Sequence, residues 1–148
     1  MIFAFTSASS AATLPVSKEC AEKMGADKNI AAFVLPLGAT IHMDGTAIYQ
    51  CVATVFLATC AGVDLTLTQM IMVVAIATLS AIGTAGTPGA GVIMLTMVLT
   101  TLGIPVDYIG LIIAVDRLFD MGRTTMNITG DIVGSLCVTK WENGKLNS

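Results

Sequence analysis

Charged residues are scarce in this sequence of 148 residues, and their scarcity excludes several classes of protein. Only 11% of the residues are charged, against about 25% in a typical soluble domain. The net charge of −3 and the lack of a basic run with interleaved aromatic residues give no support for nucleic-acid binding. The single histidine cannot complete a zinc site with four cysteines that form no Cys-x-x-Cys pair. The sequence also lacks a Gly-rich phosphate-binding loop, so nucleotide chemistry is not expected.

Long uncharged stretches make up much of the chain and indicate a membrane protein. Hydrophobic residues account for 55% of the sequence. Residues 45–63 and residues 65–106 contain no charged side chain. Each stretch reaches the length of about 18 residues that suggests a membrane segment. The chain is too short for a second domain, so we expect a single all-α membrane unit.

A polar stripe lies inside an otherwise apolar segment near the C-terminus. Its members are Asp116, Asp120, Arg123, Asn127 and Asp131. At about 100° per residue, this spacing puts all of them within an arc of roughly 80° on one helix. The other side of the helix would carry Leu118, Phe119, Met121, Met126 and Ile128. Because a charge is costly inside a bilayer, such a stripe indicates a substrate or ion path. The alternative is the solvated face of a soluble helix, which the composition disfavours.

The charges divide the first half of the chain into segments. A small-residue stretch is followed by a polar helix over residues 16–29, which belongs at a water interface. A long apolar span over residues 30–60 comes next, with His42 and Asp44 near its middle. A continuous lipid-facing helix would not tolerate these residues cheaply, so we expect the span to be broken there.

The uncharged stretch of residues 65–106 is too long for one membrane crossing. Four glycines and Pro88 gather at its centre, in residues 80–91, and oppose a continuous helix. Each flanking arm of about 15 residues is shorter than the roughly 20 residues of a full crossing. This pattern predicts a re-entrant hairpin, followed by a last transmembrane helix over residues 108–138.

Lysines predict the orientation of the spans. They lie before the first span and after the last one, at Lys18, Lys23, Lys28, Lys140 and Lys145. The links near Asp64 and Asp107 have none. The positive-inside rule therefore predicts that both ends of the chain are cytoplasmic.

Four segments carry a resemblance to a known family. In order and spacing, TSASSAATLP, LPLGATIHMDGTAIYQ, SAIGTAGTPGAG and DMGRTTMNITGD resemble the core of the glutamate/aspartate and dicarboxylate sodium symporters, which include the excitatory amino acid transporters. The resemblance covers nearly the whole chain but only the C-terminal third of such a transporter. It implies a partial transport domain: the second half of a first re-entrant hairpin (1–15), an interfacial helix (16–29), a transmembrane helix broken at Met43 to Thr46 (30–60), a second re-entrant hairpin acting as extracellular gate (65–106), a last transmembrane helix (108–138) and a cytoplasmic tail (139–148). For a complete protein it also implies a homotrimer in the plasma membrane.

The same resemblance implies a set of substrate contacts. They are Ser10, Thr46, Thr87, Gly91, Asp120, Arg123, Thr124 and Asn127. Asp120 resembles the partner of the substrate amine, Arg123 the partner of its side-chain carboxylate, and Asn127 a contact to the main-chain amino acid groups. The chemistry agrees, since a guanidinium forms a planar donor fork for a carboxylate and an amine in a low-dielectric site needs an anion.

For sodium, the resemblance implies three sites. The first uses carbonyls of Gly38, His42 and Asn127 with the Asp131 carboxylate, the second uses carbonyls around Thr40, Ala81, Ile82 and Thr84, and the third uses Asp44. Hard cations prefer oxygen ligands, and unwound helix segments expose carbonyl groups.

His42 departs from the family pattern, which usually has asparagine at this position. An imidazole offers nitrogen rather than an amide oxygen, so the third site and the number of coupled ions stay open. With a pKa near 6.5 the ring also leaves proton coupling open, beside a simple packing role.

The leading hypothesis is sodium-coupled symport of glutamate or aspartate by a domain that moves as a block, without covalent chemistry or a cofactor other than the coupling ions. A C4-dicarboxylate symporter is the close variant, and Asp120 argues against it because a dicarboxylate has no amine. A non-transporting fragment that binds full-length relatives is a further hypothesis. An intramembrane enzyme that uses Asp44 and Asp131 as an acid/base pair is the last.

Overall fold

A computed structural model describes residues 1–146, and it is built of helices alone. The elements are α1 (Ile2–Ser7), α2 (Ser10–Lys23), α3 (Lys28–Ile41), α4 (Asp44–Cys60), α5 (Leu67–Ile82), α6 (Ala90–Thr101), the short 3-10 helix η1 (Val106–Tyr108) and α7 (Ile109–Asn143). No strand occurs among the described residues, which confirms the predicted all-α class. The last two residues of the tail predicted over 139–148 lie outside the described range.

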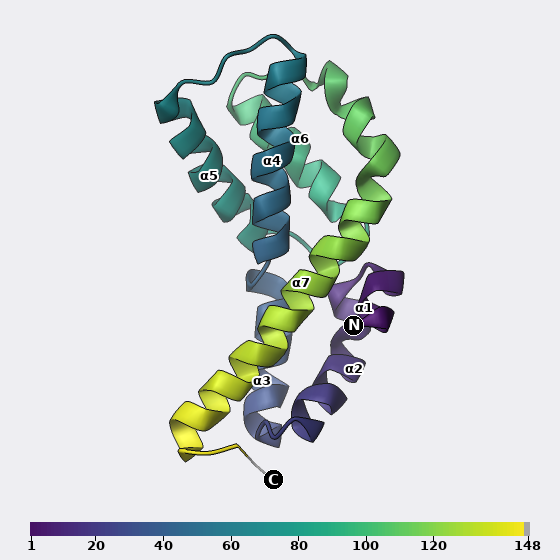
Figure 1. Cartoon of the computed structure of the whole chain (residues 1–148), viewed down its shortest axis with the longest axis vertical. Helices are drawn as coiled ribbons and strands as arrows, with labels where there is room; N and C mark the ends of the chain where they lie inside the picture. Colours follow the sequence, from purple (N-terminus) through teal and green to yellow (C-terminus); the bar gives the residue numbers. More distant parts are fainter. Residues whose placement is uncertain (147–148) are drawn as a thin grey trace.

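Helix α7 organises the molecule, because it runs the length of the structure and most of the other helices pack against it (Figure 1). Its N-terminal part packs against α4 and α6, with α5 on the far side of α4, and its C-terminal part packs against α1, α2 and α3 (Figure 1). Helices α3 and α4 follow each other along the same side of α7, with a break between them at mid-height. The molecule therefore has two halves that share one long helix.

Local hydrogen bonds explain where several helices begin. The Ser9 hydroxyl accepts a hydrogen bond from the Ala12 N–H and caps α2, and Asp27 caps α3 in the same way. Thr66 and Gln69 form a reciprocal capping box at the start of α5. The sequence suggested a boundary between residues 15 and 16, but α2 continues through Pro15. The fixed φ of proline suits a helix, and its cost here is one missing N–H donor.

The break between α3 and α4 is confined to His42 and Met43. The family resemblance implies a break from Met43 to Thr46, whereas Gly45 and Thr46 lie in the first turn of α4. The reason is a partner from α7, since the side-chain oxygen of Asn127 accepts the Gly45 N–H at 2.8 Å. One N–H that would otherwise be free at the start of α4 is thereby satisfied.

Helices α5 and α6 form an antiparallel pair joined by residues 83–89. Their lengths are 16 and 12 residues, both below the roughly 20 residues of a full membrane crossing. The joining segment lies against the turn between α1 and α2, because the Gly86 carbonyl accepts hydrogen bonds from the Ser9 hydroxyl at 2.8 Å and the Ala11 N–H at 3.3 Å. A Cβ on Gly86 would also lie 3.2 Å from the Ala39 carbonyl oxygen at the end of α3. Three interruptions of the helices thus meet in one place.

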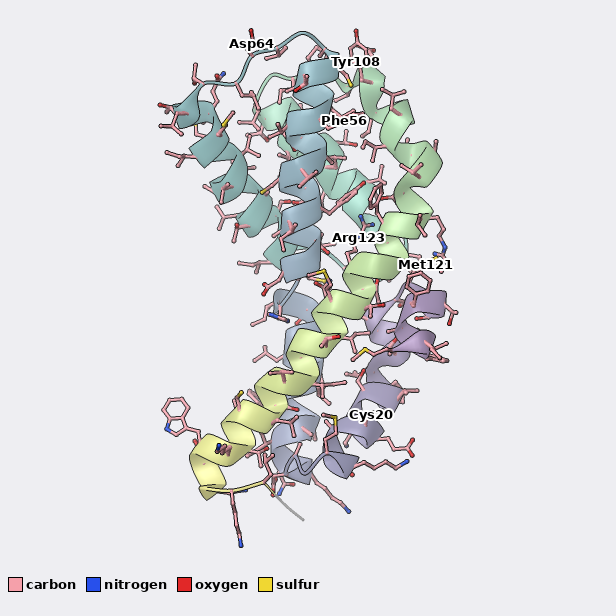
Figure 2. All side chains as sticks on the ribbon, in the orientation of Figure 1. Cys20, Phe56, Asp64, Tyr108, Met121 and Arg123 are labelled. Atoms are coloured by element: carbon pink, nitrogen blue, oxygen red, sulfur yellow. The ribbon has the colours of Figure 1, made fainter. Side chains whose placement is uncertain are left out.

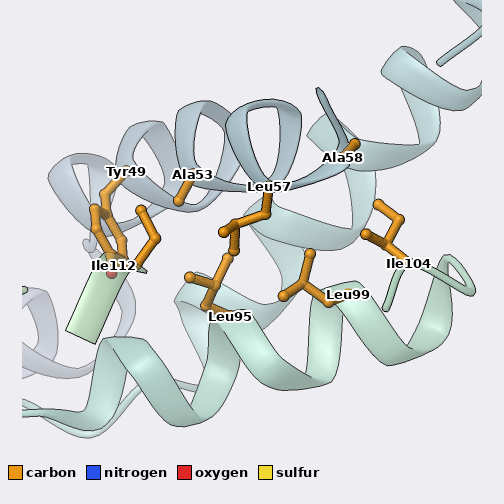
Figure 3. Packing of buried hydrophobic residues seen from close by; sticks show 8 residues of the cluster. All are labelled: Tyr49, Ala53, Leu57, Ala58, Leu95, Leu99, Ile104 and Ile112. Atoms are coloured by element: carbon orange, nitrogen blue, oxygen red, sulfur yellow. The ribbon is translucent and has the colours of Figure 1, made fainter. Parts of the chain in front are cut away.

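Two apolar clusters stabilise the two halves. The first, shown in Figure 3, joins α4, α6 and α7 and contains Tyr49, Ala53, Leu57, Ala58, Leu95, Leu99, Ile104 and Ile112. The second joins α1, α2, α3 and α7 and contains Ala4, Ala21, Ala26, Ala31, Leu35, Ile128 and Ile132. Buried polar residues of α7 lie between them along the helix, from Asp116 to Asn127. The polar layer is therefore enclosed by apolar packing on both sides.

One helical stretch of the described residues, Lys28–Cys60, is long and apolar enough to cross a membrane. It comprises α3, the break and α4. The end of the molecule near Cys20 is opposite the end near Asp64 and Tyr108 (Figure 2). The turn between α2 and α3 and the end of α7 share the first of these ends (Figure 1). The lysines and the acidic links are therefore separated along the long axis.

Gly45 tests the close approach of α4 and α7. In Gly45→Ala the new Cβ would lie 2.8 Å from the Arg123 carbonyl oxygen and 3.0 Å from the Asn127 side-chain oxygen. We expect the free energy of unfolding to fall by about 1–3 kcal/mol, because the two helices must separate. Thermal unfolding of the purified protein measures this. Gly134→Ala in α7 is the matched control, since nothing lies within 4 Å of its Cβ, and equal melting temperatures for the two variants would contradict this packing.

Candidate functional site

The polar stripe of α7 faces the interior of the molecule. Its five members are between 2% and 7% exposed: Asp116, Asp120, Arg123, Asn127 and Asp131. Three apolar residues of the other side, Leu118, Phe119 and Met126, are exposed. Ile128 differs, because it packs inside the second apolar cluster. The stripe is therefore an internal polar surface and not the solvated face of a soluble helix.

Arg123 is the centre of the buried charges. Its Nε donates to Asp120 Oδ1 at 3.0 Å, and its Nη1 donates to Asp116 Oδ1 at 3.2 Å. The guanidinium carbon lies 4.4 Å from the ring centroid of Tyr49, and the Tyr49 hydroxyl donates to Asp116 at 2.8 Å. Two carboxylates and one aromatic face compensate this cation, as a buried charge requires.

One nitrogen of Arg123 is left without a partner. Its Nη2 is fully buried and makes no hydrogen bond to the described residues. The guanidinium lies directly against Gly91 of α6, where a Cβ would overlap it. An unsatisfied buried donor on a charged group is costly, so this nitrogen is a position at which an acceptor from a ligand would be stabilised.

The segment between α5 and α6 is held over this cluster by Asp120. The Gly89 N–H donates to Asp120 Oδ2 at 2.9 Å, while Oδ1 of the same carboxylate accepts from Arg123. Gly89 has a φ of +80°, which glycine adopts without strain. Asp120 therefore links the last helix to the joining segment.

Asn127 ties α7 to the break between α3 and α4. Its side-chain oxygen accepts from Gly45, and its amide nitrogen lies 3.1 Å from the Met43 sulfur and 3.4 Å from the Thr46 hydroxyl. Asn127 is 2% exposed. The side chain thus fixes the geometry of the break.

All of the substrate residues predicted from the sequence line one cavity. They are Ser10, Thr46, Thr87, Gly91, Asp120, Arg123, Thr124 and Asn127. The cavity has a volume of about 20 Å³, which is room for about one water molecule. Pockets for small ligands are typically about 300–1,000 Å³, so this arrangement is closed. The cavity in this arrangement is therefore too small for an amino acid.

The residues of the first predicted ion site lie together. Asp131 is 5% exposed, and its carboxylate lies directly against Gly38, where a Cβ would overlap it. His42 Nδ1 lies 2.9 Å from Asp131 Oδ1. Asn127 lies one helical turn before Asp131 on α7.

The second predicted ion site contains residues from two helix ends. Thr40 lies near the end of α3, and Ala81 and Ile82 end α5. The buried hydroxyl of Thr84 donates to the Ser80 carbonyl at 2.9 Å. The last carbonyls of a helix lack helical partners and carry the negative end of its dipole, which suits a hard cation.

Asp44, predicted for a third ion site, is largely exposed, with 72% of its side chain accessible. Its Oδ2 lies 3.0 Å from Nε2 of His42. Among residues 1–146, no group of three His, Cys, Asp or Glu side chains is arranged to hold a metal ion. Because the other ring nitrogen of His42 contacts Asp131, the ring lies between the carboxylates of Asp44 and Asp131.

Three residues of this site were not singled out from the sequence as binding residues. Asp116 belongs to the predicted stripe, and its spacing of seven residues from Arg123 could have paired them on one helix face. Tyr49 and Met43 come from α4 and its cap, and only the tertiary structure brings them to Arg123 and Asn127.

Comparison with known proteins identifies related chains. The model of the family described as "Sodium:dicarboxylate symporter family" matches residues 1–141. An excitatory amino acid transporter of Caenorhabditis elegans is 45% identical over 148 residues, covering 99% of this chain and 29% of the relative. Excitatory amino acid transporter 3 of Mus musculus is 46% identical over 147 residues, with 99% and 28% covered. Excitatory amino acid transporter 1 of Rattus norvegicus is 48% identical over 136 residues, with 91% and 25% covered. The chain thus spans between a quarter and three tenths of these relatives.

Asp116→Asn tests the compensation of the buried guanidinium. Removing one partner of a buried ion pair leaves a charge unpaired, so we expect the free energy of unfolding to fall by about 3 kcal/mol. Asp107→Asn changes an exposed carboxylate and should shift the free energy of unfolding by less than about 0.5 kcal/mol. Chemical or thermal unfolding of the purified proteins compares the two. Similar stabilities would show that Asp116 does not compensate Arg123.

Proposed function

The chain belongs to the sodium:dicarboxylate symporter family, and we propose that it forms the substrate- and ion-binding part of a symporter that carries glutamate or aspartate with sodium across the plasma membrane. The family is one of transporters, which supports binding and movement as the chemistry of the site. The relatives are named as excitatory amino acid transporters, which supports an acidic amino acid as the substrate.

The observation that carries this proposal is the unpaired Nη2 of Arg123. A buried guanidinium nitrogen at the wall of a closed cavity is a donor for one carboxylate oxygen. Two further nitrogens of the same group already bond to Asp116 and Asp120. The side-chain carboxylate of the substrate would occupy the remaining position.

The substrate amine would bind at Asp120. When segment 83–89 moves away, the Gly89 N–H leaves Asp120 Oδ2, and this oxygen becomes an acceptor in a buried site. A substrate ammonium group supplies a donor and a positive charge at the same place. Thr124 and Asn127 line the cavity next to it and would contact the main-chain groups.

Sodium would bind close enough to the substrate for the two to be coupled. Asn127 lines the substrate cavity, and Asp131 lies one helical turn further along α7 against Gly38. The ends of α3 and α5 offer carbonyl groups around Thr40, Ala81, Ile82 and Thr84. Each ligand orders the same break and the same joining segment, so each lowers the ordering cost for the other.

The pair α5–α6 would act as the extracellular gate of the site. Both arms are too short for a full crossing, which supports a re-entrant hairpin. Non-helical backbone at membrane depth needs protein partners, and segment 83–89 has them in Ser9 and Ala11. The first hairpin would contribute α1, the Ala8–Ser9 turn and the start of α2, and the remaining length of a full transporter would provide the scaffold and the trimer contacts.

The lysine-rich end of the molecule would face the cytoplasm. It carries the turn between α2 and α3 and the end of α7, whereas Asp64 and Tyr108, the residue after Asp107, lie at the other end. Met1 contacts Thr129, partway along α7. Met1 therefore does not mark either end of the molecule, and the proposed orientation rests on the lysines of the α2–α3 turn and the C-terminal tail.

Asp120→Asn separates an amino acid symporter from a C4-dicarboxylate symporter. The variant loses the anion that balances the substrate amine, so we expect aspartate binding to weaken at least about 100-fold, on the scale of a lost charge-assisted contact. Succinate has no amine, so its binding should not weaken, because the variant removes an anion that opposes this ligand. Isothermal titration of the purified protein with each ligand, in sodium and in choline, measures both affinities.

Asp107→Asn serves as the control because its carboxylate is exposed and distant from the cavity. Wild-type protein that binds succinate but not aspartate would favour the dicarboxylate variant. Binding of neither ligand by the 148-residue chain, together with sodium-dependent binding by a longer natural chain, would assign the fragment a role only within the longer protein.

A cross-link between the two turns tests the gate. A Cβ on Gly86 would lie 3.3 Å from the Ser10 Cβ, close to the spacing of about 3.8 Å in a disulfide. We expect Ser10→Cys with Gly86→Cys, made after the natural cysteines are replaced by serine, to lose aspartate binding on oxidation and to regain it with a thiol reductant. Each single cysteine variant, oxidised in parallel, is the control. Unchanged binding by the oxidised pair would mean that the segment does not have to move.

A further inference from the structure

His42 links two carboxylates that belong to different helices. Its Nδ1 lies 2.9 Å from Asp131 Oδ1 on α7, and its Nε2 lies 3.0 Å from Asp44 Oδ2 at the start of α4. Both ring nitrogens are therefore used, and each faces one acidic side chain. The ring also lies in the break between α3 and α4, where the backbone leaves its helical path.

The position of the ring is built into α7. Gly130 lies directly against the Cε1 atom of the imidazole, and a Cβ at residue 130 would overlap the ring. The Asp131 side chain that it contacts is only 4% accessible. The His42 ring thus fits the space that Gly130 leaves open on α7.

This arrangement does not fit a sodium ion between the same two carboxylates. Hard cations bind oxygen, whereas an imidazole nitrogen suits transition metals. The ring already contacts Asp131 Oδ1 and Asp44 Oδ2, which are the oxygens that an ion in this space would need.

We propose that the His42 imidazole occupies the position of one coupling cation. A shorter side chain at residue 42 could not bridge Asp44 and Asp131, and the protein would then bind one more sodium ion with each substrate molecule. This inference rests on the proposed function, because it concerns the ions that accompany the substrate. A covalently attached ring stays with the protein when substrate and ions leave. His42 thereby sets how much of the sodium gradient is coupled to each transported molecule.

The number of sodium ions bound with the substrate tests the proposal. For the purified protein, the slope of log Kd for aspartate against log sodium concentration gives this number, with choline holding the ionic strength constant. In His42→Asn the amide is too short to reach both carboxylates, so we expect the slope to steepen by about one. A tenfold rise in sodium would then tighten aspartate binding about tenfold more than in the wild type. Equal slopes would overturn the proposal.

Two further measurements keep the result interpretable. Ile41→Val changes an exposed neighbour of His42 and should keep the wild-type slope. If neither this chain nor a longer natural chain that contains it binds aspartate at any sodium concentration, the proposed function is wrong, and the melting temperature without substrate tests His42 separately. The melting temperature should rise more with added sodium in His42→Asn than in the wild type. If His42→Asn does not fold, His42→Gln replaces it in this comparison. An equal rise would reject the role of the ring.

Discussion

The burial of the Arg123 guanidinium is the constraint on which the rest of the structure depends. A cation at this depth is tolerated only with opposite charges beside it, and Asp116 and Asp120 provide them from preceding turns of the same helix. The Tyr49 ring fixes α4 against the same group, and Asp120 fixes the segment between α5 and α6. The buried charge and its partners thus help to place two parts of the chain, α4 and the segment between α5 and α6, around α7.

The interruptions of the helices meet because each needs hydrogen-bond partners that the others supply. The Gly86 carbonyl is satisfied by Ser9 and Ala11, and the Gly45 N–H is satisfied by Asn127. Backbone groups left free inside an apolar environment would each cost several kcal/mol, roughly. The apolar clusters on either side exclude water, so these partners have to come from the protein. A polar layer between two apolar cores is therefore both the weakest place for regular helix and the place where ligands can replace existing contacts.

The sequence was sufficient for the features that depend on periodicity and composition. The spacing of the stripe from Asp116 to Asp131 predicted one inward face of a helix, and the glycines of residues 80–91 predicted a turn between short arms. It was not sufficient for contacts between helices. The contact of Tyr49 with Arg123 and the bridge formed by His42 join residues more than 70 positions apart, and no local pattern encodes them. The end of the break at Met43 likewise depends on Asn127, a partner that helix propensity does not include.

The closed cavity has a consequence for selectivity. Because it holds about one water molecule, a substrate binds only by replacing contacts that the protein already makes to itself. The carboxylate of a ligand gains the unpaired nitrogen of Arg123, but opening the site also removes the Gly89 hydrogen bond from Asp120. A ligand with a carboxylate and no amine leaves Oδ2 of Asp120 without a donor, and the cost of this opposes its binding. A ligand with both groups would restore each contact, which under the proposed function favours an acidic amino acid.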